Sequence, residues 1–290
     1  MKSKTDNTFA WFTVPTLILI LVITVIPFAL NFYYSLFKWN GVGSHMKFIG
    51  LKNFIYILTR DRRFLSSVFF TLKFSVYYVF IVNVLAFVVA LRLMKTNFFS
   101  NMNRSFIYIP HIISLTAVGL IWSFILGPGF QGLSEKLPFE FLKLSWLGQP
   151  ALAFYSVIIV AIWRNVGFYM IIYIAGLQSI PQDMLEAASI DGASGWKRLY
   201  HITIPMIIPA ITICTLTSMM YAFKLFDIIL VLTMGGPAGL TNTVAFNIYD
   251  DAFARFKFGL ATAKSVIFFF GVLVVSMIHL KLMKTKETDA

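Results

Sequence analysis

The strongest constraint on this chain is a series of apolar runs, each long enough to cross a lipid bilayer. Stretches of about 18 or more apolar residues with few charges are typical of transmembrane helices, whereas barrel strands span about ten residues and alternate in polarity. The runs here are continuous, and they cover residues 9–37, 68–94, 105–126, 150–177, 204–234 and 259–283. The sequence therefore predicts an all-α polytopic membrane protein with six spans, forming one domain over residues 1–290.

The composition agrees with a membrane protein and argues against nucleic-acid binding. Charged residues make up 12% of the chain and hydrophobic residues 59%, whereas soluble proteins carry about 25% charged residues. The formal net charge is +12, but the basic residues lie singly or in short groups at the ends of the runs, where they can meet lipid headgroups. We interpret the first run, which follows Lys2 and Lys4, as a retained span, because no small-residue cleavage site follows it.

The sequence predicts no catalytic residue, no metal site and no bound cofactor. Cys214 is the single cysteine and lies inside an apolar run, so neither a disulfide nor a thiolate metal site is available. No H-E-x-x-H or G-x-S-x-G string is present. The remaining candidates for an enzyme buried in the membrane are interpreted as structural polar groups: His111, His201, Asp250 and Asp251.

Several polar or ionisable side chains fall within the apolar runs, where such groups are costly and often mark a solute pathway. Arg164 and Asn165 lie in the middle of the fourth run, and either a structural role inside the bundle or a solute contact fits them. Lys224 and Asp227 are three residues apart, so on one helix they would share a face, and either a mutual structural pair or a solute-lining role fits them. We expect Lys73 and Lys264, near the ends of their runs, to extend toward the headgroups.

A polar segment of about 179–209 separates the fourth run from the fifth. Ser179 and Gln182 have the spacing of a capping box, and Ser194 offers a second helix start, so two short helices are predicted with a break at Gly192. Met184, Leu185 and Ala188 would form the apolar stripe of the first helix, and Trp196, Leu199 and Tyr200 that of the second. By physics alone, the segment fits either amphipathic helices lying on the membrane or an element that docks into a partner.

A longer pattern in this segment resembles a known family. Glu186-Ala187-Ala188, Gly192, Ile202 and Ile204-Pro205 match the signature EAA-x3-G-x9-I-x-L-P of the permeases of ABC importers, with Ile204 in place of Leu. Shorter strings resemble the carbohydrate-uptake branch of that family, and they follow the same order along nearly the whole chain: Gly50-Leu-Lys-Asn-Phe54, Ser179-Ile-Pro181, Ile190-Asp-Gly-Ala193, Phe226-Asp227 and Thr233-Met-Gly-Gly-Pro237.

The resemblance implies a fold, a function and a set of partners. The fold would be that of a type I ABC importer permease, in which the 179–209 segment is the cytoplasmic coupling loop and both termini are cytoplasmic. The counts of Lys and Arg, which are equal on the two sides, do not decide this orientation. By position, the contact with the ATP-hydrolysing subunit would involve Glu186, Ala187, Ala188, Asp191 and Gly192.

The implied partners are a second homologous permease, two ATP-binding subunits and an extracytoplasmic solute-binding protein. The solute would be a sugar or sugar derivative, and the loops 38–66, 127–149 and 235–258 would receive the binding protein. Since the chain has no G-x-x-x-x-G-K-[ST] string, ATP would bind to the partner subunits. The alternative is an ion-coupled secondary transporter of a small polar solute, with Arg164, Lys224 and Asp227 as its relay.

Overall fold

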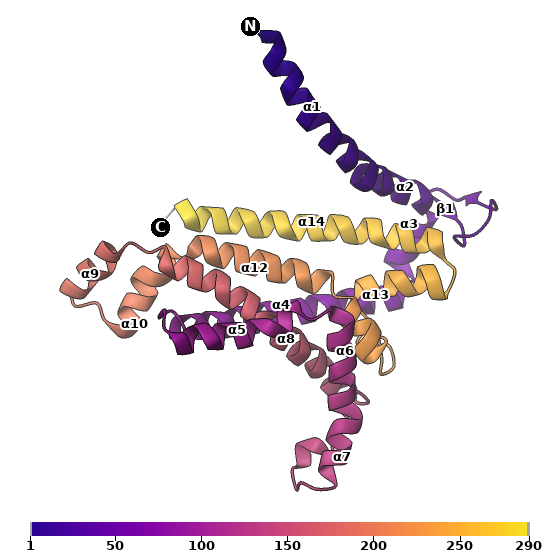
Figure 1. Cartoon of the computed structure of the whole chain (residues 1–290). Coiled ribbons are helices and arrows are strands. Elements are labelled where there is room, and N and C mark those ends of the chain that lie inside the picture. The colour runs from indigo at the N-terminus through magenta and orange to yellow at the C-terminus, as the bar shows by residue number, and fades with distance from the viewer. Residues whose placement is uncertain (1, 289–290) are drawn as a thin grey trace. The chain divides into compact units, whose positions relative to one another are not determined.

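The computed structural model describes residues 2–288, with side chains described for residues 11–284, and it contains two compact units (Figure 1). Residues 1–62 and 247–271 form the first unit, and residues 63–246 and 272–290 form the second. Lys2, Lys4 and Lys286, which entered the charge counts, lie outside the described side chains.

The first unit combines a long N-terminal helix with short elements and the beginning of the last helix. Its elements are α1 (Lys2–Ile20), the π-helical turn η1 (Leu21–Val25), α2 (Ile26–Ser35), β1 (Phe37–Lys38), β2 (Lys47–Phe48), α3 (Lys52–Thr59) and the π-helical turn η6 (Asp250–Ala254). Two further helices, α13 (Val244–Tyr249) and α14 (Phe258–Thr288), contribute residues to both units.

The predicted first span is confirmed as a continuous helical run over Trp11–Ser35, none of whose most apolar stretch is buried within the chain. The π-helical turn η1 lies just before Pro27, whose missing N–H removes one α-helical hydrogen bond. The helix therefore continues past the proline with a locally widened turn.

Asn53 connects the ends of three elements of the first unit. Strands β1 and β2 pair antiparallel, with Phe37 opposite Phe48. The buried amide of Asn53 donates to the carbonyls of Ser35, Phe37 and Gly259 at 2.8, 3.0 and 3.2 Å. These bonds fix the end of α2, the two-stranded ribbon and the start of α14 in one arrangement.

The second unit is a helical bundle whose central element is α8. Its elements are α4 (Arg62–Arg92), α5 (Phe98–Ile112), α6 (Leu115–Phe124), η2 (Ile125–Gly129), α7 (Phe130–Ser134), η3 (Glu140–Leu142), α8 (Pro150–Gln178), α9 (Gln182–Ile190), α10 (Gly195–Arg198), η4 (Leu199–Thr203), α11 (Ile204–Met206), α12 (Ile208–Phe223), η5 (Ile229–Thr233) and the C-terminal part of α14.

Close helix packing holds this bundle together. One side of α4 is buried at every fourth position, with side chains that become smaller toward its C-terminus: Phe70, Phe74, Tyr78, Val82, Ala86 and Ala90. At Gly167 of α8, an added Cβ would lie 2.2 Å from the carbonyl oxygen of Ile107 in α5. Small residues allow membrane helices to approach this closely, so Gly167 sets the crossing of α5 and α8.

The all-α, multi-span prediction is confirmed. Among the described residues, five helices are long and apolar enough to span a membrane, and a sixth span results if Gly195–Met206 and Ile208–Phe223, bent by 71°, count as one. These spans arise from the same six regions of sequence that the apolar runs indicated, although two of them have different bounds.

The predicted third span, 105–126, is wrong as a single helix. Ile113 and Ser114 are extended, and the Ser114 hydroxyl accepts a hydrogen bond from the backbone N–H of Ala117, so that a new helix begins there. Gly127 has non-helical φ and ψ and interrupts this helix with a kink, beyond which the apolar helical run continues to Ser134.

The predicted fifth span, 204–234, is also wrong in its bounds. Its helix α12 ends at Phe223, and a short break separates it from the next helical segment, which includes η5. Asp227 lies beyond this break, so Lys224 and Asp227 do not share a face of one helix, contrary to the prediction.

Candidate functional site

The segment between α8 and α12 forms two short helices that project from one end of the second unit (Figure 1). The predicted break is confirmed, because α9 ends at Ile190 and α10 begins at Gly195. The predicted capping box is wrong: Pro181 is the N-cap of α9, and the Ser179 hydroxyl instead donates to the carbonyl of Gly176 at the end of α8. Ser194 is the N-cap of α10, but its side chain makes no capping hydrogen bond.

Gly192 closes helix α9 in a left-handed conformation, with a φ of 74°. The N–H of Ala193 donates to the carbonyl of Ala188 at 2.8 Å, and the N–H of Gly192 donates to that of Ser189 at 3.2 Å. This is the Schellman arrangement, in which a glycine is favoured because a Cβ is strained at positive φ. The glycine of the signature therefore fixes the angle at which the chain leaves α9.

The two helices expose charged and apolar side chains together. Glu186 and Ala187 are exposed, and Ala188 is buried. Ile190 and Trp196 are 87% and 83% exposed, which is unusual for side chains of this size. The predicted apolar stripes are only partly correct. Leu185 and Leu199 are half-buried and line a pocket of about 240 Å³ beside the ends of α4 and α8, whereas Met184 and Tyr200 are exposed.

A second cluster lies inside the bundle around Arg164 and Asn165 of α8. The Arg164 guanidinium donates to the side-chain oxygen of Asn165 at 3.0 Å, and to the carbonyls of His111 and Ile113 at 3.2 and 3.4 Å. The His111 ring lies on Phe168 with the ring centroids 4.7 Å apart, and its Nδ1 is 3.2 Å from the same Asn165 oxygen. Arg164 thus holds the last carbonyls of α5, where a cation is favoured by the helix dipole.

Next to α8, tyrosines and short polar side chains form a buried layer. Tyr173 donates from its hydroxyl to the side-chain oxygen of Asn83 at 2.8 Å, and the Asn83 amide donates to the Ser218 hydroxyl at 2.9 Å. Within the described part of the chain, the hydroxyls of Tyr78 and Tyr221 are buried without a hydrogen-bond partner, although Asn165 lies near both, and their ring centroids are 5.2 Å apart. Buried polar groups are rarely left unpaired in proteins, so these two hydroxyls point to a missing partner.

Within the described part of the chain, hydrogen bonds connect only two of the four residues expected along a solute path, Arg164 and Asn165. Arg164 and Asn165 share one hydrogen-bonded cluster with His111. Lys224 is exposed just after the end of α12, and Asp227 is half-buried beyond the break. Among the expected structural polar groups, His201 lies 3.1 Å from the carbonyl of Lys197.

Comparison with known proteins gives the context for these clusters. Residues 82–284 match the family described as "Binding-protein-dependent transport system inner membrane component". The chain is 37% identical, over 99% of each chain, to the "Probable starch degradation products transport system permease protein AmyD" of Thermoanaerobacterium thermosulfurigenes. It is 31% identical to the "Trehalose/maltose transport system permease protein MalF" of Thermococcus litoralis, over 92% of this chain and 90% of that one.

The chain belongs to this family of transport permeases.

The fold of the permease agrees with this membership. A chain from the crystal structure of a bacterial ABC transporter involved in the import of alginate superposes with a TM-score of 0.82. The match covers 97% of the permease and 96% of that chain, at 21% sequence identity. At this identity the likeness concerns the fold alone.

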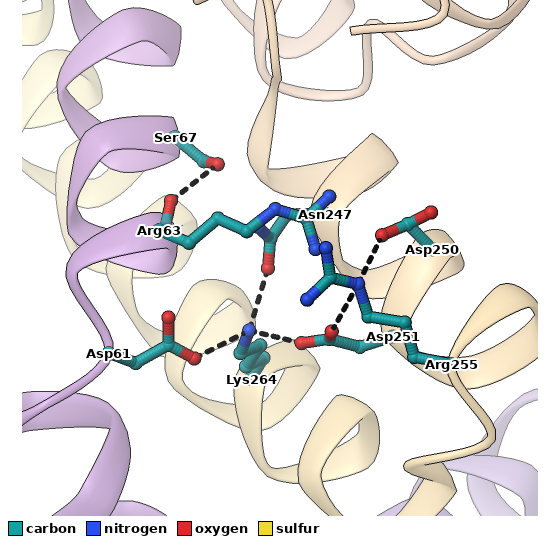
Figure 2. A network of polar contacts seen from close by, with 8 residues as sticks. All are labelled: Asp61, Arg63, Ser67, Asn247, Asp250, Asp251, Arg255 and Lys264. Carbon is teal, nitrogen blue, oxygen red and sulfur yellow. Dashed lines mark hydrogen bonds and ion pairs between the residues drawn. The ribbon is translucent and has the colours of Figure 1, made fainter. Parts of the chain in front are cut away.

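The permease also contains a buried charge cluster in its first unit, which sequence reasoning missed (Figure 2). Lys264 was expected to extend toward the headgroups, and this prediction is wrong: its side chain is 1% exposed. Its ammonium lies 2.7 Å from Asp61, 2.7 Å from the side-chain oxygen of Asn247, and in contact with Asp251. Arg255 pairs with Asp250 at 2.9 Å beside this cluster.

The other lysine that was expected to snorkel behaves differently. Lys73 is exposed, and its ammonium lies 4.5 Å from the ring centroid of Phe154. Lys264 differs from Lys73 because two carboxylates reach its ammonium. Asp251 lies 13 residues before Lys264 and Asp61 is much more distant in sequence, so neither ion pair could be predicted from helical spacing.

Proposed function

We propose that the permease is the membrane-spanning subunit of an ATP-driven importer, and that it moves a sugar or sugar derivative delivered by an extracytoplasmic solute-binding protein. The observation that carries this proposal is the α9–α10 element, which exposes Glu186, Ala187 and Gly192 of the family signature in a chain of several membrane spans. The relatives named above support a carbohydrate solute, since one carries starch degradation products in its name and another carries trehalose and maltose.

The α9–α10 element is the part of the chain best suited to contact an ATP-hydrolysing subunit. Glu186 offers a charge for a basic partner group, and the small Ala187 beside it permits a close approach. Ile190 and Trp196 offer apolar area that a groove in the partner would cover. Asp191 caps α9 just before Gly192 and is exposed on the same turn.

In this arrangement the α9–α10 element and both termini face the cytoplasm. Movement of the ATPase would reach the spans through the two ends of the element, which continue into α8 and α12. A small pocket separates the inner side of the element from the ends of α4 and α8. At this pocket the α9–α10 element can therefore move relative to the ends of α4 and α8 without disrupting closely packed side chains.

The proposed assembly contains a second, homologous permease, two ATP-binding subunits and the binding protein. The permease itself forms the single transmembrane domain of residues 1–290 in this assembly. The family description supports dependence on a binding protein, and the loops 38–66, 127–149 and 235–258 are its proposed contact surface. ATP is bound by the partner subunits, so the permease is not itself an enzyme.

For the solute path we propose the side of the bundle where Asn165 lies near the buried Tyr78 and Tyr221. The unpaired hydroxyls of Tyr78 and Tyr221 support this choice, because a polyhydroxylated solute supplies the donors and acceptors that they lack. Arg164, Lys224 and Asp227 remain candidates for the same path. Of these, Arg164 is already engaged with backbone carbonyls.

A reconstitution experiment tests the proposal. The permease would be placed in proteoliposomes alone, and then with its second permease, ATPase subunits and sugar-loaded binding protein. We expect accumulation of radiolabelled maltodextrin or trehalose only with the complete set and internal ATP. Uphill uptake by the permease alone, or uptake that stops with an ionophore while ATP persists, would contradict it and support an ion-coupled transporter.

A further inference from the structure

The first unit contains a pocket of about 550 Å³, lined by residues of the 38–66 and 235–258 loops and by the start of α14. It lies between the β1–β2 ribbon, α3 and the turn that leads into α14. The side chains that matter for its chemistry are Lys38, Trp39, His45, Lys47, Tyr56 and Lys257.

The charged side chains that line this pocket are all cationic. Lys38, Lys47 and Lys257 contribute three positive charges, and no Asp or Glu is among the lining residues. Asp61 and Asp251 belong to the same unit and lie near the lining residues in sequence, but their carboxylates bind Lys264. Three lysines line one cavity that no acidic residue lines, and this charge balance favours an anionic ligand.

Hydrogen bonds and ring contacts hold one wall of the pocket in place, and a turn with a left-handed residue forms another. Trp39 donates from its indole N–H to the carbonyl of Gly43 at 3.1 Å, and its ring packs against those of Tyr34 and Phe258, with centroids 4.9 and 5.1 Å away. On the other side, Phe256 has a φ of 54°. A left-handed conformation is strained for a non-glycine residue and often marks a functional position.

The strained turn at Phe256 orients Lys257. The backbone N–H of Arg255 donates to the carbonyl of Asp250 at 2.9 Å and closes the π-helical turn η6, and the N–H of Lys257 donates to the carbonyl of Asp251 at 2.7 Å. Lys257 then stands one residue before α14. The turn therefore brings one of the three lysines to the rim of the pocket.

The pocket lies where two spans end. Helix α2 ends at Ser35, three residues before Lys38, and α14 begins at Phe258, directly after Lys257. Lys beside Trp and Tyr at the end of a span is typical of the level of lipid headgroups. We propose that this pocket binds the phosphate-bearing headgroup of an anionic phospholipid.

Native mass spectrometry of the full-length permease tests this site. Protein in mild detergent would be titrated with dioleoyl-phosphatidylglycerol and, separately, with dioleoyl-phosphatidylcholine, to give the ratio of the two apparent affinities. A Lys near an anionic surface contributes about 1 kcal/mol, which corresponds to about fivefold in affinity. The triple variant Lys38→Gln/Lys47→Gln/Lys257→Gln should therefore lower the preference for phosphatidylglycerol at least about tenfold.

A matched control removes the same charge elsewhere. Lys52, Arg60 and Lys136 are exposed and do not line the pocket, so Lys52→Gln/Arg60→Gln/Lys136→Gln should keep the preference. An equal loss in both triple variants, or no preference in the unaltered permease, would overturn the proposal. Displacement of the lipid by millimolar inorganic phosphate would reassign the pocket to a free anion. A loss of binding-protein affinity in lipid-free detergent, with the lipid preference unchanged, would reassign it to protein docking.

Discussion

The ammonium of Lys264 lies 2.7 Å from a carboxylate oxygen of Asp61, and both side chains are at least nine-tenths buried. Asp251 and Asn247 supply two further oxygen acceptors. A lysine has three N–H donors, so the three acceptors satisfy it completely. Within the first unit, this cluster connects the segment before α4, the residues around η6 and the helix α14 (Figure 2).

Replacing Lys264 with Met should strongly destabilise the permease. The substitution leaves Asp61 and Asp251 buried without this cation, and breaking a buried ion pair from one side costs about 3–5 kcal/mol. The measurement is the thermal unfolding midpoint of the full-length protein in detergent. The control Lys73→Met removes an exposed lysine and should change the midpoint little. Equal midpoints for both variants would contradict a structural role for the cluster.

The two unpaired tyrosine hydroxyls give a test of the solute path. Tyr78→Phe and Tyr221→Phe each remove a buried hydroxyl that has no protein partner, so the thermal midpoint should stay unchanged or rise slightly. If these hydroxyls bind solute, the KM for uptake by the complete transporter should rise. The loss of one hydrogen bond of about 1 kcal/mol corresponds to about a fivefold increase.

Tyr173→Phe is the matched control for this pair. Its hydroxyl donates to Asn83, so its removal should lower the midpoint through the loss of a protein hydrogen bond. An unchanged KM in the Tyr78 and Tyr221 variants would show that the solute passes elsewhere.

Arg164→Met should lower stability more than Lys224→Met does. Arg164 donates to the half-buried carbonyls of His111 and Ile113 at the break between α5 and α6, and the loss of such hydrogen bonds costs about 1 kcal/mol or more. Lys224 is exposed, and its side chain forms no hydrogen bond or ion pair within the described part of the chain. Unfolding by heat, followed by tryptophan fluorescence, distinguishes the two. If Arg164→Met raised only KM and kept the midpoint, Arg164 would be a solute contact and not a positioning residue.

Much of the fold could be predicted because long apolar runs in the sequence identify membrane spans. The uncharged runs located the regions that became α4, α8 and α14, since burial in lipid requires long apolar helices. The break in the 179–209 segment was predictable as well, because a positive φ at Gly192 is a local property of glycine.

Features that depend on contacts between distant segments could not be predicted in this way. The third run is divided at Ser114, where Arg164 of another helix binds the carbonyls of His111 and Ile113. Lys264 is buried because Asp61, distant in sequence, reaches it. Similarly, the buried layer around Tyr78 depends on how α4, α8 and α12 pack, and hydrophobic periodicity does not indicate which hydroxyls remain unpaired.

The central claim is that α9 and α10 couple the permease to an ATPase, and co-purification tests it most directly. Glu186→Lys reverses an exposed charge, and Gly192→Pro cannot adopt the φ of 74° and removes the N–H that bonds to Ser189. Glu135→Lys makes the same charge change at an exposed position outside the element. We predict that all three variants insert into the membrane, and that Glu186→Lys and Gly192→Pro lose the ATPase subunit whereas Glu135→Lys retains it. Unchanged recovery of the ATPase with Glu186→Lys and Gly192→Pro would contradict the coupling role of this element.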